Sequence, residues 1–180
     1  MGFFSVSEVG SAYLFEKYPQ FCEKYETFLL GVPEPQGISK PSTDGVLRVV
    51  SCSMLYDDFS LVSILKGTDP NLSYNPVDVF VNVSSTEGTS VAMMEAISCG
   101  IPVIATAVGG NVEIVREKNG FLLSENPTPD EIADALLQVC DNRELWLEKR
   151  KGSREVWQER YNETTNFEAF AQKLVEIRKR

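Results

Sequence analysis

The chain has 180 residues, of which 43% are hydrophobic and 24% charged, a size and composition typical of a soluble globular domain. The formal net charge of −9 disfavours binding to nucleic acid or to an anionic lipid surface. The absence of histidine and of any CxxC pair excludes the common zinc sites, Ser-His triads and Cys-His dyads. The four scattered cysteines are therefore expected to be reduced and structural, and any catalysis has to use carboxylates, backbone dipoles, lysine or arginine.

The start of the chain lacks the basic residues and the long apolar run of a signal peptide, and no apolar run approaches the roughly 20 residues of a membrane-spanning helix. These features predict a cytoplasmic protein. Residues 6–18 predict an amphipathic helix that Ser7 caps and Pro19 ends. A short segment over residues 21–30 follows, and the proline and glycine content of residues 33–45 predicts a loop or linker.

Strands and helices then alternate. The expected strands are residues 46–52, 77–83, 102–107 and 120–123, and the expected helices are residues 58–66, 90–99, 111–116 and 128–140. Ser90 or Thr89 should cap the second of these helices, and Asn111 the third. Two polar-faced helices, divided near residues 162–166, complete the chain. This order predicts an α/β fold with a Rossmann-like parallel sheet flanked by helices.

Ligands of parallel sheets bind at the carboxyl ends of strands, and two loops qualify, residues 84–89 and 108–111. The helix that begins after the first loop leaves free N–H groups and a partial positive charge, which suit a phosphate or a sugar hydroxyl. The residues that offer these groups are Gly88, Thr89, Ser90 and Val91. In the second loop, Gly109 and Gly110 let the backbone approach a ligand, although a plain tight turn explains them equally well.

Two acids flank the first loop and the helix after it. Glu87 lies in the loop, and Glu95 lies within the apolar run Val-Ala-Met-Met-Glu-Ala-Ile. A carboxylate can accept hydrogen bonds from two neighbouring hydroxyls of a sugar, whereas a dry, unpaired carboxylate costs several kcal/mol. Glu95 therefore needs a partner, either a ligand diol or an ordinary backbone donor, base or water. Glu113 fits either a helix-dipole contact or a ligand contact.

Four linked blocks resemble the carboxyl-terminal, donor-binding lobe of GT-B retaining glycosyltransferases, the glycosyl transferase group 1 family. They are EGTSVAMMEA from residue 87, CGIPVIAT from residue 99, GGNVEIV from residue 109 and NGFLL from residue 119. Glu87 and Glu95 match the E-x7-E motif of that family. The resemblance divides the chain into a helical lead-in and linker (residues 1–45), a nucleotide-sugar-binding lobe (residues 46–142) and carboxyl-terminal helices (residues 143–180).

The resemblance implies transfer of a sugar from a nucleotide-diphosphate donor, such as a UDP- or GDP-sugar, by a cytosolic and often membrane-peripheral enzyme. It implies that Glu87 contacts the donor sugar and is catalytic, that Glu95 holds the ribose hydroxyls, and that the amides of Gly88, Thr89 and Ser90 approach the sugar and diphosphate. It implies neither a metal nor a cofactor.

The sequence also departs from the family pattern. Family members carry an acceptor-binding lobe, and they carry an Arg and a Lys where residues 53–58 have two acids and no base; Lys66 is the nearest candidate. Residues 53–76 admit one crossover helix, where the family has further βα units, so we expect an internal shortening. These departures predict weak or absent activity of the isolated chain. They leave open a non-catalytic interaction module that docks onto a second lobe or a separate protein, whereas the lack of histidine disfavours a GT-B epimerase.

Overall fold

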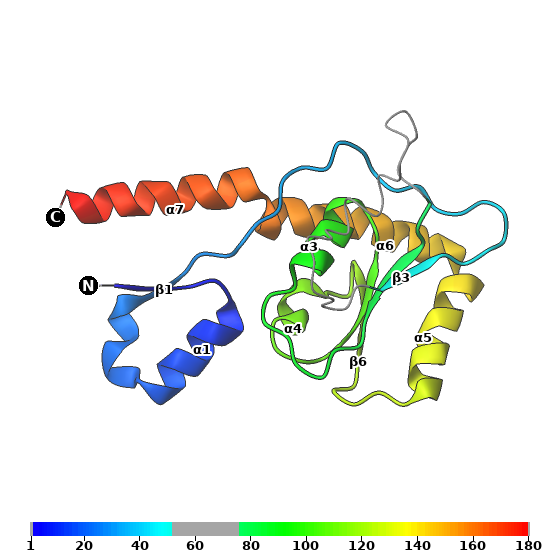
Figure 1. The fold of residues 1–180 in the computed structure, drawn as a ribbon, viewed down its shortest axis with the longest axis horizontal. Coiled ribbons are helices and arrows are strands. Elements are labelled where there is room, and N and C mark those ends of the chain that lie inside the picture. Colours follow the sequence, from blue (N-terminus) through cyan, green and yellow to red (C-terminus); the bar gives the residue numbers. More distant parts are fainter. Residues whose placement is uncertain (1, 52–75, 180) are drawn as a thin grey trace.

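A computed structural model of the chain describes residues 2–51 and 76–179 (Figure 1). Its main body is a four-stranded sheet in which every neighbouring pair is parallel and the strands follow chain order. The strands are β3 (Val49–Ser51), β4 (Val79–Asn82), β5 (Val103–Thr106) and β6 (Gly120–Leu123). In Figure 1, α3 (Val91–Ser98) and α4 (Asn111–Ile114) lie on one side of the sheet and α5 (Pro129–Asp141) on the other. The predicted α/β fold class is confirmed.

The sheet separates two hydrophobic cores, because successive side chains of a strand point to opposite faces. Phe80 packs in the core under α3, which also contains Met93, Met94 and Ile97, all fully buried. Val79 and Val81 point to the other face, where Val139 of α5 covers them. All residues of β4 and β5 are buried, as expected for inner strands of a parallel sheet.

The predicted ends of α3 are confirmed. The Ser90 hydroxyl caps the helix by accepting a hydrogen bond from the Met93 N–H at 3.4 Å. Gly100 follows with a φ of 73°, the left-handed conformation that glycine adopts at helix ends. Thr128 caps α5 in the same way, at the start of the helix expected over residues 128–140.

Helix α6 (Arg143–Val156) crosses the amino ends of the strands, and its side chains donate hydrogen bonds to backbone carbonyls there. Trp146 Nε1 donates to the Asp78 carbonyl at 2.7 Å, and Arg150 Nη1 donates to the Val77 carbonyl at 2.7 Å. Lys149 Nζ donates to the Gly120 carbonyl at 3.3 Å. Because α6 occupies the amino edge, the carboxyl edge is left for the loops that the sequence singled out.

After α6, a π-helical turn (Trp157–Tyr161) leads to α7 (Glu163–Arg178). The Asn162 side chain caps α7 by accepting a hydrogen bond from the Thr165 N–H at 3.3 Å. The predicted pair of carboxyl-terminal helices and the position of their division are therefore confirmed.

Residues 3–27 form a small βαβ unit at the same end of the molecule as α7 (Figure 1). Strands β1 (Phe3–Ser5) and β2 (Tyr25–Thr27) pair in parallel, and α1 (Glu8–Lys17) and a 3₁₀ helix (Pro19–Lys24) connect them. The unit packs on α7 through the rings of Phe4, Phe28 and Phe170, whose centroids lie 5.3 to 5.5 Å apart. The sequence did not predict these two strands.

Three expectations for individual elements need correction. Ser7 caps α1 as predicted, but the helix is not amphipathic, since Ser11 is its one buried residue. The strand expected over residues 46–52 begins only at Val49, because the backbone N–H groups of Val46 and Arg48 bind the carboxylates of Asp44 and Asp78. The helix expected over residues 58–66 lies outside the described residues, as do the loop of residues 53–58 and the expected internal shortening.

The third correction concerns α4. It ends at Ile114, and Gly110 rather than Asn111 occupies the cap position. Asn111 is the first helical residue, and its amide Nδ2 donates to the Thr106 carbonyl at 3.1 Å, at the end of β5. The side chain thus holds α4 against the sheet and is not free to cap the helix.

Candidate functional site

The two predicted loops meet at the carboxyl edge of the sheet. The Gly110 N–H donates to the Gly88 carbonyl at 2.9 Å, so the backbones of the loops are in direct contact. A Cβ atom on Gly109 would overlap the Glu87 carbonyl oxygen, and one on Gly110 would overlap the Gly88 carbonyl oxygen. Gly109 also has a φ of 47°, which disfavours any side chain. The contact between the loops therefore accounts for both glycines, and their contact with a ligand stays a prediction.

Glu87 is held by side chains that follow β4. Its Oε1 accepts hydrogen bonds from Asn82 Nδ2 at 3.1 Å and from Ser84 Oγ at 3.2 Å. The Ser84 carbonyl accepts a hydrogen bond from Thr106 Oγ1 at 2.6 Å, which ties the loop to β5. Within residues 2–51 and 76–179, no hydrogen bond reaches Glu87 Oε2. The arrangement fixes the carboxylate while one oxygen keeps its capacity to accept.

Sequence reasoning missed Asn82, Ser84 and Thr106 as the residues that position Glu87. The position of two of them in the sequence could have indicated this role, since Asn82 and Thr106 are buried polar residues that end otherwise apolar strands. A buried polar side chain at the carboxyl end of a parallel strand needs a hydrogen-bond partner, and the adjacent loop provides one.

The start of α3 combines open space with helix N–H groups. A Cβ on Gly88 would meet nothing within 4 Å, and Val91 in the first turn is 51% exposed. Ser90, whose hydroxyl caps the helix, is buried, and Thr89 is partly buried. The predicted anion-binding residues are thus adjacent to the Glu87 carboxylate at the carboxyl edge.

Glu95 lies about 7.5 Å along the helix axis from Ser90, estimated from the helical rise. Its neighbours Met93, Met94, Ala96 and Ile97 are fully buried, and Glu95 is partly buried. Both methionines serve core packing. The acid therefore projects from the partly exposed side of a helix whose other side forms the core.

Glu113 is 4% exposed and binds a different helix from the one that contains it. Its Oε2 accepts a hydrogen bond from the Glu8 N–H at 2.9 Å, and its Oε1 accepts one from the Val9 N–H at 2.7 Å. These groups are the first two N–H donors of α1. The sequence associated Glu113 with the start of its own helix α4 or with a ligand, whereas its carboxylate binds the positive end of α1.

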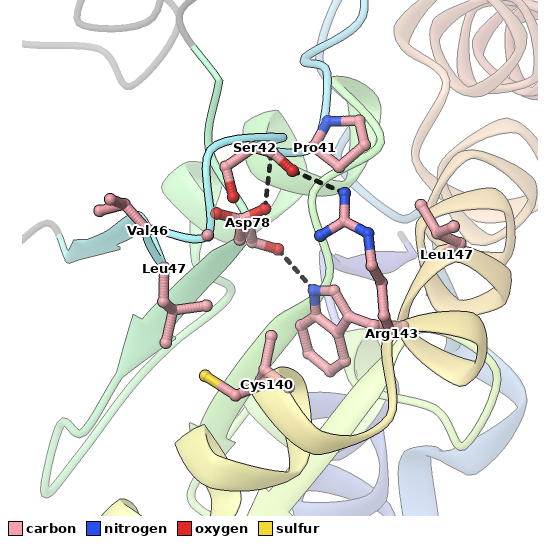
Figure 2. Close-up of a pocket in the computed structure, with 11 residues that line it drawn as sticks. Pro41, Ser42, Val46, Leu47, Asp78, Cys140, Arg143 and Leu147 are labelled. Carbon is pink, nitrogen blue, oxygen red and sulfur yellow. Dashed lines mark hydrogen bonds between the residues drawn. The ribbon is translucent and has the colours of Figure 1, made fainter.

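A hollow of about 250 Å³ lies at the opposite, amino edge, where Leu47, Val139 and Trp146 contribute to its lining (Figure 2). Its polar groups bind one another: Arg143 Nη2 donates to the Ser42 carbonyl at 2.6 Å, and the Ser42 N–H donates to Asp78 Oδ1 at 2.9 Å. These contacts satisfy the backbone of the preceding loop, so the hollow gives no reason to move the candidate site away from the carboxyl edge.

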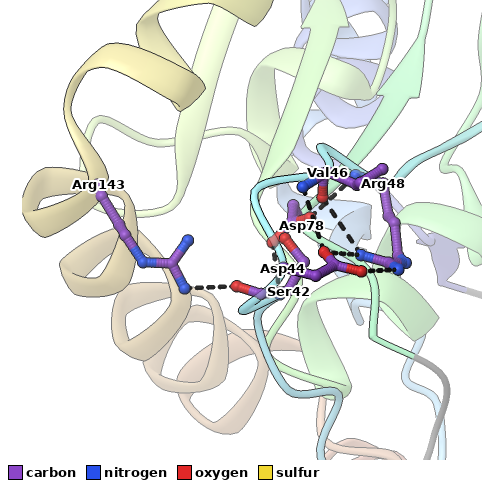
Figure 3. A network of polar contacts seen from close by, with 6 residues as sticks. All are labelled: Ser42, Asp44, Val46, Arg48, Asp78 and Arg143. Atoms are coloured by element: carbon purple, nitrogen blue, oxygen red, sulfur yellow. Dashed lines mark hydrogen bonds and ion pairs between the residues drawn. The ribbon is translucent and has the colours of Figure 1, made fainter.

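The same network extends to the surface through Asp44 and Arg48 (Figure 3). Arg48 Nη1 and Nη2 donate to the two Asp44 oxygens at 2.8 and 2.6 Å. These side-chain hydrogen bonds, with a further one from the Val46 N–H, hold the pKa of Asp44 well below its ordinary range. Asp44 is exposed and Arg48 is only partly buried, so the pair orders the loop before β3 more than it stabilises the fold.

Comparison with known proteins decides the family. The model of the family described as "Glycosyl transferases group 1" matches residues 5–142, most of the chain. The chain belongs to this family. Among curated relatives, sucrose-phosphate synthase 4 of Arabidopsis thaliana is 40% identical over 73 residues, which cover 41% of this chain and 7% of the relative. A probable sucrose-phosphate synthase of Vicia faba is 30% identical over 125 residues, 67% of this chain and 12% of the relative. This glycosyltransferase chain thus spans about a tenth of the length of these relatives.

Solved structures with a similar fold include HepE of Anabaena in complex with UDP, with a TM-score of 0.74 and 16% identity over 96% of this chain and 63% of that one. Sucrose-phosphate synthase from Thermosynechococcus elongatus gives a TM-score of 0.72 and 16% identity over 97% of this chain and 57% of that one. At this identity the similarity shows the GT-B fold alone. The glycosyltransferase chain spans about three fifths of the length of each structure.

None of the helices in residues 2–51 and 76–179 is long and apolar enough to cross a membrane. No group of three or more Cys, Asp or Glu residues there has a metal-binding arrangement.

Proposed function

We propose that this chain is the donor-binding lobe of a retaining glycosyltransferase, and that a nucleotide-diphosphate sugar binds at the carboxyl edge of the sheet. The observation that carries the proposal is the contact between the two loops, where Gly110 binds Gly88 next to the anchored Glu87 carboxylate. This places a fixed acceptor group, open backbone and the start of α3 side by side, which suits a ligand with hydroxyl and phosphate groups.

Each residue has a chemical role in this proposal. Glu87 accepts a hydrogen bond from a hydroxyl of the donor sugar through Oε2, since its Oε1 is already occupied, and it is the catalytic residue of the set. The amides of Gly88, Thr89, Ser90 and Val91 bind the diphosphate at the positive end of the α3 dipole. Glu95, further along α3, accepts hydrogen bonds from the two ribose hydroxyls. Gly109 and Gly110 form the opposite wall, and neither metal nor cofactor takes part.

The donor that we propose to test first is UDP-glucose. HepE, which shares the fold over 96% of this chain, has been solved with UDP and with UDP-glucose. GDP-sugars are the comparison, because the described residues of the site contact sugar and phosphate and do not select a base.

We further propose that the chain alone transfers sugar weakly or not at all, in the cytoplasm and with no more than peripheral membrane contact. Transfer needs an acceptor site, and this chain spans only 63% and 57% of the length of the two structures that it resembles. Binding of the donor is therefore a more direct test of the lobe than turnover.

Isothermal titration with UDP-glucose and a GDP-sugar, supported by thermal shift, tests this proposal. Wild type should release heat with at least one donor, and Glu87→Ala and Glu95→Ala should each weaken binding by about tenfold or more, as loss of a charged hydrogen bond predicts. Glu176→Ala is the matched control, since it removes an exposed acid from α7. No heat with any donor, or equal affinities of Glu95→Ala and wild type, contradicts the proposal.

A second candidate function is a module that docks onto a separate lobe or protein. The supporting observation is the exposure of large apolar side chains on the βαβ unit and α7, including Phe3 (48%), Tyr13 (55%), Phe167 (49%) and Val175 (52%). A two-stranded parallel sheet is also marginal alone. Sedimentation should then show self-association or capture of the second lobe, and a clean monomer that binds UDP-glucose favours the donor-binding function instead.

A further inference from the structure

The Glu113 carboxylate completes the cap of α1 from a distance of about 105 residues along the chain. A helix leaves its first four N–H groups without partners in the helix. In α1, Glu113 binds the N–H groups of Glu8 and Val9, the Ser7 hydroxyl binds the N–H of Gly10 at 3.0 Å, and the Ser5 hydroxyl binds the N–H of the cap residue Ser7 at 3.3 Å. Without Glu113, half of this cap is missing, so the βαβ unit depends on a side chain of the sheet-bearing body.

The same residue is linked to the candidate donor loop through its backbone. The Glu113 N–H donates to the Gly110 carbonyl at 3.0 Å, and the Gly110 N–H donates to the Gly88 carbonyl at 2.9 Å. An unbroken series of hydrogen bonds therefore runs from Glu8 and Val9 through Glu113 and Gly110 to Gly88. Because α4 is a single turn, only a short stretch of backbone separates Glu113 from the contact between the loops.

A second contact holds the same junction. Arg160 Nη2, in the turn before α7, lies 3.0 Å from Glu8 Oε1. The Glu8 side chain is 53% exposed, so this ion pair contributes little to the free energy of docking. The buried Glu113 carboxylate, which binds two backbone donors, is the stronger of the two contacts.

We propose that Glu113 is a positioning residue that couples the docking of the amino-terminal βαβ unit to the conformation of the donor-binding loops. Displacing α1 shifts Glu113 and α4, and with them the Gly110–Gly88 contact beside Glu87. By linkage, a ligand that favours the closed loop contact also favours the docked α1, and the two effects are equal in free energy. The part of this inference that concerns donor affinity rests on the proposed function, and the part that concerns the loops does not.

Amide hydrogen exchange of the full chain, followed by NMR without ligand, tests the coupling directly. In Glu113→Ala, the amides of Glu8, Val9 and also Gly110 should exchange at least about tenfold faster than in wild type. Glu113→Gln keeps one acceptor oxygen and should give intermediate rates for all three. The control Glu159→Gln removes an acid from an exposed ion pair with a lysine and should change none of them. If Glu8 and Val9 exchange faster while Gly110 does not, the coupling is refuted.

The slowly exchanging amides of β5 report whether Glu113→Ala is folded. If their signals are missing, the comparison is made with Glu113→Gln instead. UDP affinity of the same proteins separates the two proposals. We expect about fivefold weaker binding in Glu113→Ala than in Glu159→Gln, at the lower end of typical allosteric couplings. No binding of UDP by wild type overturns the proposed function and leaves the exchange result to decide the coupling. Equal UDP affinities in both variants overturn the coupling.

Discussion

Replacing Gly110 by alanine tests whether the close contact between the two loops is what fixes the candidate site. Gly110 has a φ of −71° and a ψ of −8°, so alanine can adopt its backbone conformation without strain. The added Cβ would overlap the Gly88 carbonyl oxygen and lie 3.0 Å from the Gly88 carbonyl carbon and 3.2 Å from Thr89 Cα. The effect of the substitution is therefore steric and confined to the loop contact.

The size of the effect follows from these distances. To reach an ordinary carbon–carbon separation of about 3.5 Å, the Gly88 carbonyl carbon has to retreat by about 0.5 Å, and the overlapping oxygen by more. This movement weakens the hydrogen bond between Gly110 and Gly88, which contributes about 1 kcal/mol, and overpacking adds about 1–3 kcal/mol. We expect the free energy of unfolding of Gly110→Ala to fall by about 2–4 kcal/mol, which lowers Tm by about 5–15 °C in a chain of this size.

Gly88→Ala is the matched control, because it adds the same methyl group to the other side of the same contact, where a Cβ would meet nothing within 4 Å. Its Tm, measured by differential scanning calorimetry, should stay within about 2 °C of wild type. Its affinity for UDP-glucose should nevertheless fall if Gly88 approaches the donor, whereas Gly110→Ala should lose both stability and affinity. A Tm of Gly110→Ala equal to that of Gly88→Ala refutes the steric argument.

Three further predictions concern the amino edge and the turn before α5. Trp146→Phe keeps an aromatic ring over Phe121 but removes the 2.7 Å hydrogen bond to the Asp78 carbonyl. The free energy of unfolding, measured with urea, should therefore fall by about 1–3 kcal/mol, and a fall below about 0.5 kcal/mol contradicts this account. Arg150→Met removes the charged donor that binds the carbonyls of Val77 and Ser39 and should cost about 3 kcal/mol by the same measurement. Lys151→Met, at an exposed neighbour, is the control and should cost almost nothing. Hydrogen bonds from the N–H of Ser124 and, second in size, from its hydroxyl lower the pKa of Glu131. This contact therefore stabilises the fold above the ordinary pKa of about 4.3, and the stabilisation is lost as the pH falls below that value. Wild type should therefore lose more stability than Glu131→Gln between pH 5 and pH 3, and parallel curves would show that the contact is absent in solution.

Local patterns were sufficient to predict the sheet-bearing body. The run Val-Phe-Val-Asn predicted β4, the serine cap predicted the start of α3, and the helix expected over residues 128–140 corresponds to α5. Prediction failed where distant groups replaced local ones. The Asp44 and Asp78 carboxylates take the N–H groups that a longer β3 would have used, and neither partner follows from β-propensity.

The candidate site shows the same limit. Its position at the carboxyl edge and its loops followed from the order of elements, and the family resemblance is now established. The partner of Glu113 could not be found, because no periodicity relates a residue of α4 to the first turn of α1. The glycine pair was assigned to ligand approach or to a plain turn, whereas its nearest neighbour is the backbone of the other loop.

The distribution of basic side chains decides how this lobe can bind an anion. Lys149 and Arg150 donate to carbonyls at the starts of the strands, and Arg154 donates to the Ser98 carbonyl at the end of α3. These basic side chains thus bind at the amino edge, where backbone carbonyls and the negative ends of helix dipoles lie. At the carboxyl edge, the two loops, residues 84–89 and 108–111, contain no lysine or arginine, so backbone N–H groups at the start of α3 are the charge-free donors that they offer to a diphosphate. Binding through such fixed, neutral donors should depend less on salt than binding through lysines, and a steep loss of UDP affinity between 50 and 500 mM NaCl would show that a base outside the described residues supplies the contact.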